Sequence, residues 1–116
     1  MKNLILLGTL LLSTLTLADD TEWKPIEGVY ALTGEDLVDP NPNESNDSYL
    51  RVNLVGQNAK ALYQAMQTLP VTDECTGSLA KNIGEMQCLY YQPDNKYECH
   101  FSIEIATQKV KYGLPC

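Results

Sequence analysis

The sequence predicts a small α+β domain in which one helix packs on an antiparallel sheet of three to five strands. Two segments alternate apolar and polar residues as strands do, one segment has the apolar spacing of a helix, and four cysteines can cross-link a small core. A chain of 116 residues has room for one such core. The domain is expected to span residues 49–116, after a leader at 1–18 and an acidic segment at 19–48.

Residues 49–55 are expected to form the first strand of this domain, and Gly56 ends the pattern. A shorter strand is expected upstream, near residues 28–32. In residues 49–55 the apolar side chains alternate with polar ones, as in a strand with one buried face. The apolar set is Leu50, Val52 and Leu54, and the opposite set is Tyr49, Arg51 and Asn53.

A helix is predicted over residues 58–69, with Asn58 as its N-cap and Pro70 as its stop. Apolar side chains recur at helical spacing along this stretch, which would place them on one face against the sheet. These are Ala59, Leu62, Tyr63, Met66 and either Leu69 or Val71.

A β-hairpin is predicted over residues 85–106, because two strand-like runs flank a turn at residues 92–96 that contains Pro93 and Asp94. The second run shows the clearest alternation in the chain, with Cys99, Phe101 and Ile103 on one side. Residues 109–113 are expected to add a further edge strand.

The four cysteines, Cys75, Cys88, Cys99 and Cys116, indicate two disulfides, because they form an even set in a small chain with an export leader. Three pairings are open. The hairpin places Cys88 directly opposite Cys99, which favours that bond and leaves Cys75 to pair with Cys116. The spacings contain no close ligand pair for zinc and no C-x-x-C redox motif.

Residues 1–18 have the pattern of a cleaved secretory signal peptide. Lys2 precedes a 14-residue run without charge, and Ala18 precedes the acidic Asp19. A membrane anchor is the alternative, but a span needs about 20 apolar residues. We therefore expect a periplasmic or secreted protein with no membrane span after cleavage.

The mature chain would have 98 residues, with 15 acidic and 7 basic side chains, and a net charge of −8. The whole imbalance lies in residues 19–48, where nine acids oppose Lys24 alone, and residues 39–48 within it form a loop rich in proline and asparagine. Such a field repels nucleic acid and attracts a cationic partner. Nucleic-acid binding is therefore not expected.

No catalytic, cofactor or metal site is predicted, and the chain is not expected to be an enzyme. His100 is the only histidine, and a triad with Glu98 and Ser102 would lie on an open strand face without an oxyanion hole. The carboxylate pairs Glu98 with Glu104 and Asp73 with Glu74 likewise lack a predicted pocket. Residues 39–50 depart from a calcium-binding EF-hand loop at its glycine and glutamate positions.

Two groups of residues are candidate partner contacts. Tyrosine is enriched in protein interfaces, and acidic clusters steer basic partners. The hairpin group is Tyr91, Lys96 and Tyr97, and the acidic group is Glu35, Asp36, Asp39, Glu44 and Asp47.

In general character such a chain is similar to small periplasmic inhibitors and immunity proteins, which implies binding to a protein, here a cationic one. The alternative is an envelope or secreted accessory domain that binds a small ligand, calcium or cell-wall glycan. A glycan binder would depend little on salt, whereas a binder of a cationic protein would depend on it strongly.

Overall fold

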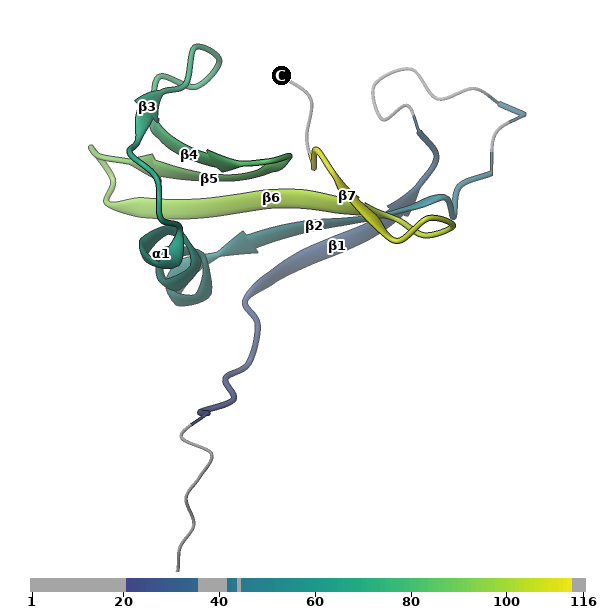
Figure 1. The fold of residues 1–116 in the computed structure, drawn as a ribbon, viewed down its shortest axis with the longest axis horizontal. Helices are drawn as coiled ribbons and strands as arrows, with labels where there is room; N and C mark the ends of the chain where they lie inside the picture. The colour runs from purple at the N-terminus through teal and green to yellow at the C-terminus, as the bar shows by residue number, and fades with distance from the viewer. Residues whose placement is uncertain (1–20, 36–41, 44, 114–116) are drawn as a thin grey trace, which may run out of the picture.

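The computed structural model describes residues 21–35, 42–43 and 45–113, and these form one helix and seven strands (Figure 1). No helix within these residues is long and apolar enough to cross a bilayer. In chain order the elements are β1 (Gly28–Thr33), β2 (Tyr49–Val55), α1 (Gly56–Ala65), β3 (Val71–Thr72), β4 (Leu79–Ile83), β5 (Met86–Tyr91), β6 (Lys96–Glu104) and β7 (Lys109–Lys111).

All neighbouring strands pair antiparallel in a single sheet of order β1-β2-β6-β5-β4-β3. The nine-residue β6 lies at the centre: β2 pairs with one side of it, and β5 and β7 share the other. The α+β class and the antiparallel sheet are confirmed, but the predicted strand number of three to five is too low. The missed strands are β3 and β4, because Lys81 and Asn82 hide the alternation of β4.

The helix begins two residues earlier than predicted, and Asn58 is not its N-cap. Gly56 has a φ of 68°, which lets the chain turn directly from β2 into the helix. Asn58 instead binds the main chain of Glu27 through both ends of its amide group. The Glu27 carboxylate accepts from the main-chain N–H of Gln57 at 3.2 Å, so the first turn is capped from β1's entry segment.

The helix also ends four residues earlier than predicted, at Ala65. The Lys81 ammonium group donates to the carbonyl oxygens of Tyr63, at 3.1 Å, and Met66, at 3.3 Å. A cation at the carboxyl end of a helix satisfies terminal carbonyls and complements the helix dipole. Of the two alternatives for the end of the helix face, Leu69 lies beyond the helix and Val71 belongs to β3.

The hairpin and its disulfide are confirmed. Cys88 pairs with Cys99 in the register of β5 and β6, their Cα atoms lie 4.0 Å apart, and a disulfide joins them. Cys75 also takes part in a disulfide, and its predicted partner, Cys116, lies outside the described residues.

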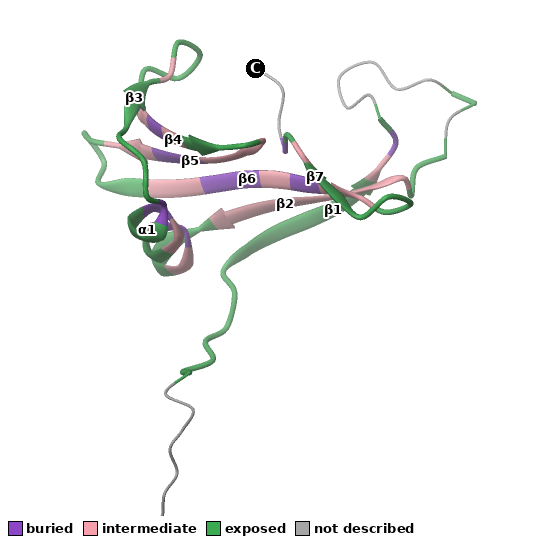
Figure 2. Cartoon of the chain, in the orientation of Figure 1, coloured by how far each residue is buried: buried purple, intermediate pink, exposed green. Residues whose placement is uncertain are grey.

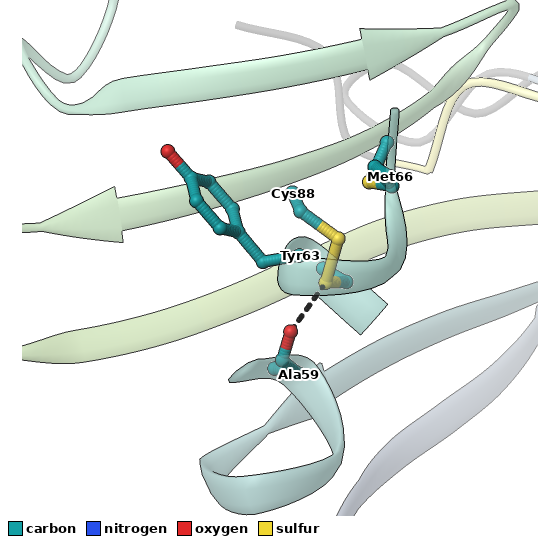
Figure 3. Packing of buried hydrophobic residues seen from close by; sticks show 5 residues of the cluster. Ala59, Tyr63, Met66 and Cys88 are labelled. Carbon is teal, nitrogen blue, oxygen red and sulfur yellow. Dashed lines mark hydrogen bonds between the residues drawn. A yellow bond between two sulfur atoms is a disulfide. The ribbon is translucent and has the colours of Figure 1, made fainter. Parts of the chain in front are cut away.

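The core lies where α1 crosses the β5–β6 half of the sheet (Figure 3). Ala59, Tyr63 and Met66 pack from the helix against the buried disulfide. The Ala59 carbonyl oxygen lies 3.4 Å from Sγ of Cys99; this sulfur has no proton to donate, so the contact is one of packing. The Tyr63 ring meets Tyr97 edge-on, with centroids 5.3 Å apart.

Candidate partner-binding surface

The structure places the hairpin group and the two described acidic residues, Glu35 and Asp47, at opposite ends of the sheet. Lys96 begins β6, and Glu104, which pairs with Tyr49 beside these two acids, ends it. Eight steps of about 3.3 Å along β6 separate its two ends by roughly 26 Å. One partner side chain cannot touch both groups.

The hairpin group is mostly engaged within the protein. Tyr97 stacks on Tyr90, with ring centroids 4.6 Å apart, and contributes to the core. Tyr91 is half-buried, and its hydroxyl donates to Glu98 at 3.3 Å. Of this group only Lys96 is exposed. Burial and the nearby Glu98 raise the pKa of Tyr91, so its hydroxyl stays protonated at neutral pH.

The described members of the acidic group border an open hollow of about 440 Å³. Glu35 and Asp47 reach it from the two ends of the β1–β2 connection, and Glu104 reaches it from β6. Tyr49 and Ile105 supply its apolar wall. Asp36, Asp39 and Glu44 lie outside the described residues.

Hydrogen bonds keep Glu104 ionised within this acidic hollow. The Thr107 hydroxyl and then the Tyr49 hydroxyl, the latter 3.1 Å away, donate to its carboxylate and hold the pKa of Glu104 below its usual value. The same bond raises the pKa of Tyr49. Lys111 and Lys109 of the neighbouring β7 also lower the pKa of Glu104, so this carboxylate is ionised at neutral pH.

Arg51, the only arginine in the sequence, forms hydrogen bonds with the segments beside the hollow. Its guanidinium donates to the Thr33 hydroxyl at 2.8 Å and to the carbonyl oxygens of Gly34, Glu35, Tyr112 and Gly113. One side chain thus ties the end of β1 to the C-terminal stretch. Five donors in a planar fork suit this use better than an ammonium group would.

The helix covers only part of its side of the sheet. The strand registers place further apolar side chains of β1, β2, β6 and β7 on the same side as Cys99, beyond the reach of α1. We call this surface the open face. It comprises Tyr30, Leu32, Leu50, Val52, Phe101, Ile103 and Val110.

Exposure of the open face increases from the centre of the sheet to its β1 edge. Phe101 on β6 and Val52 on β2 are half-buried, whereas Tyr30 on β1 is 73% exposed and Leu32 is 52% exposed (Figure 2). Large contiguous apolar patches are a feature of surfaces that contact proteins, membranes or ligands.

The opposite side of the sheet has a polar centre that does not form the triad considered above. Ser102 is fully buried, and its hydroxyl donates to the Tyr112 carbonyl at 2.7 Å. His100 is buried and contacts Glu98 at 3.4 Å through Nε2, while its Nδ1 has no hydrogen-bond partner among the described residues. The same holds for the buried Oδ1 of Asn53, its cross-strand neighbour.

The carboxylate pair of Glu98 and Glu104 is also separated too far for joint acid–base chemistry. Six residues along β6 put the two about 20 Å apart, against the roughly 5–9.5 Å of glycosidase pairs. Within residues 21–35, 42–43 and 45–113, no three His, Cys, Asp or Glu residues are grouped so as to hold a metal ion.

Comparisons of the chain with protein-family models, with curated proteins and with solved structures find no match.

Sequence reasoning missed Tyr49 and Glu104 as members of the acidic hollow and β1 as an exposed strand. The alternation of residues 49–55 and 97–106 already put Tyr49 and Glu104 on polar faces. Pairing these two strands in the antiparallel register that aligns Tyr49 with Glu104 would have joined them. Nothing in the sequence indicated that α1 would leave β1 uncovered.

Proposed function

We propose that this chain is an exported acidic binding protein that holds a cationic protein partner as an inhibitor or neutralising protein in the periplasm or outside the cell. The observation that carries the proposal is the open face, an apolar surface whose strands end at a carboxylate-lined hollow. Tyr49 and Glu104 of the hollow belong to the opposite side of the sheet, so a partner that uses both features must wrap around the strand ends. Binding of a basic protein needs both features, since charge sets the encounter rate and apolar contact sets the lifetime of the complex.

The charges would act at long range. Glu35, Asp47 and Glu104 converge on the hollow, while the domain from Tyr49 onwards balances six acids with six bases. The β1–β2 connection, residues 34–48, has five acidic side chains and no basic one, whereas Lys109 and Lys111 of β7 act on Glu104. The acidic excess of the connection would orient an approaching basic protein toward that end of the sheet. A lysine or arginine side chain of the partner would enter the hollow beside Tyr49, whose ring already has the Arg51 guanidinium 5.3 Å from its centroid.

The open face would supply the affinity. Burial of exposed apolar surface yields roughly 25 cal/mol per Å², and an exposed tyrosine such as Tyr30 brings both area and a hydroxyl group. Export is supported by the leader pattern at residues 1–18 and by the Cys88–Cys99 disulfide, a bond typical of oxidising compartments.

The test is affinity capture from periplasmic and secreted fractions with the folded, oxidised protein at low and high salt. The captured partner is then measured against the variant Glu35→Gln, Asp47→Asn, Glu104→Gln. Its association rate at low salt should fall about tenfold, because the steering charges are gone.

The matched control is Glu74→Gln, Glu85→Gln, Asp94→Asn, which removes the same charge away from the hollow and should change the rate much less. Equal rates for the two variants would contradict steering by the hollow. Recovery of no protein at either salt concentration would contradict the proposed function and favour the small-ligand or glycan alternative.

A further inference from the structure

The two edges of the sheet are built differently. One edge strand, β3, has two residues and is followed at once by Asp73 and Glu74. The other edge strand, β1, has six residues, GVYALT, without a charge or a proline. Soluble proteins blunt sheet edges with short strands, charges and prolines, because an open edge offers its backbone to another chain. β3 follows that rule and β1 does not.

On the side away from β2, no strand of the described residues pairs with β1, and its main chain has hydrogen-bonding groups on that side. Glu27 and Thr33 direct their carbonyl oxygens to β2, where the N–H groups of Val55 and Ser48 donate to them at 3.0 Å. Successive residues of a strand point their backbone groups to opposite sides. The N–H and C=O groups of Gly28, Tyr30 and Leu32 therefore point outward, away from β2.

The side chains of β1 are typical of an interior strand rather than an edge. Val29 is 68% exposed on one side of the sheet and Tyr30 is 73% exposed on the other. Strands apolar on both sides are normally covered on both faces of the sheet. In β1 both faces are exposed as well as the outer edge, so an added strand at this edge would cover part of its apolar surface.

We propose that the free edge of β1 accepts an extended, basic segment of the partner as an added β-strand. This inference rests on the proposed function and specifies how the cationic partner is held. Outward backbone groups would give affinity, and alternate apolar side chains of the added strand would extend the open face beside Tyr30 and Leu32. Basic residues at its ends would meet Glu27 and Glu35, which flank β1.

Charge disfavours a second copy of this chain as the occupant. Antiparallel pairing of two β1 strands would bring Glu27 and Glu35 of one copy beside those of the other, and each mature chain carries a net charge of −8. Like charges placed together at an interface cost several kcal/mol. A basic segment turns the same carboxylates into attractive contacts.

The probe is a capped peptide of alternating valine and threonine with two lysines at each end, titrated into the isotope-labelled, oxidised protein. We expect saturable NMR shifts at the amides of Gly28, Tyr30 and Leu32, and weaker binding at high salt. Two peptides N-methylated at alternate residues, one in each frame, are the controls. Methyl groups facing β1 should abolish binding, whereas those facing away should leave it within about twofold.

Two protein variants distinguish the contribution of the Tyr30 backbone to peptide binding from that of the Tyr30 side chain. Tyr30→Ala keeps the outward N–H and should weaken peptide binding a few-fold. Tyr30→Pro removes that N–H at an edge position where proline is tolerated, and should weaken peptide binding at least tenfold more. Equal binding by both variants, or equal loss from both methylated peptides, would overturn the added strand.

Failure of this inference can be told apart from failure of the proposed function. A captured basic partner that binds wild type and Tyr30→Pro equally would leave the binding function standing and remove β1 as its site. A dimer of the protein alone that Tyr30→Pro dissociates, measured by sedimentation, would assign the edge to a second copy and overturn the proposal.

Discussion

The sheet has two halves that differ in what covers them, although β2 and β6 run through both. At one end α1 buries the Cys88–Cys99 disulfide together with Tyr63 and Met66. At the other end the same alternation continues, but Tyr30 stays 73% exposed. A ten-residue helix is about 15 Å long, whereas a nine-residue strand reaches about 30 Å. Apolar alternation marks which side of a sheet can be buried; the length of the covering element determines how much of it is.

The largest expected effect is a difference in the free energy of unfolding between variants of the two halves. Tyr63→Ala removes a ring that packs on both Tyr90 and Tyr97 beneath the helix, and should lower the free energy of unfolding by about 3 kcal/mol. Tyr30→Ala removes an equally large side chain from the open face and should change it by no more than about 0.5 kcal/mol. Urea unfolding of the oxidised proteins measures both.

Similar losses from the two tyrosine variants would mean that the open face is covered in solution. That outcome would sharpen the comparison by showing that both halves contribute to one core.

The next largest effect is expected from a substitution that weakens the pairing of β1 with β2. Gly28 has a φ of 151°, and a Cβ there would lie 2.2 Å from the Asn53 carbonyl oxygen. Gly28→Ala should therefore cost about 1–3 kcal/mol locally. Hydrogen exchange should then speed up at the amides of Val29 and Ala31, which face β2, while the helix-covered half keeps its protection.

Gly84→Ala is the matched control for that substitution. Gly84 also has a positive φ, 59°, but a Cβ there meets no atom within 4 Å. Gly84→Ala should lower the free energy of unfolding by about 1 kcal/mol without changing hydrogen exchange in β1. Equal exchange profiles for the two variants would contradict the close approach at Gly28.

The smallest effect concerns the acidic hollow and acid pH. Thr107→Val removes the hydroxyl that contributes most to lowering the pKa of Glu104, so that pKa should rise toward its usual value. Because the folded pKa is depressed, the stability from Glu104 is present above the pKa of the unfolded chain and is lost as pH falls through the folded value. NMR titration of the Glu104 carboxyl carbon measures the shift; an unchanged pKa would contradict the Thr107 contribution.

The hairpin was predictable because its pattern is local. The turn at Pro93 and Asp94 set a register that placed Cys88 opposite Cys99, and the structure has that pair. The ends of α1 were not predictable in this way. Asn58 and Pro70 looked like a cap and a stop, but the bonds that end the helix come from Glu27 and Lys81, 30 and 18 residues away from their partners.

Two residues of the hollow were named from the sequence, but its geometry was not predicted. Glu35 and Asp47 do line a hollow, yet Glu104 and Tyr49 join it only through strand pairing between distant segments. The hairpin tyrosines looked available for contact, but Tyr97 packs against Tyr63 of the helix. Long-range packing decided each of these outcomes.

Both sulfurs of the Cys88–Cys99 pair are fully buried under α1, and this has a consequence for how the molecule matures. Thiol–disulfide exchange needs in-line access of an attacking thiolate to a sulfur atom. The oxidising agent must therefore act on the hairpin before the helix docks. Once α1 is in place, a reductant must wait for the helix to lift, so the bond in a reducing medium lasts at least as long as the waiting time for that opening.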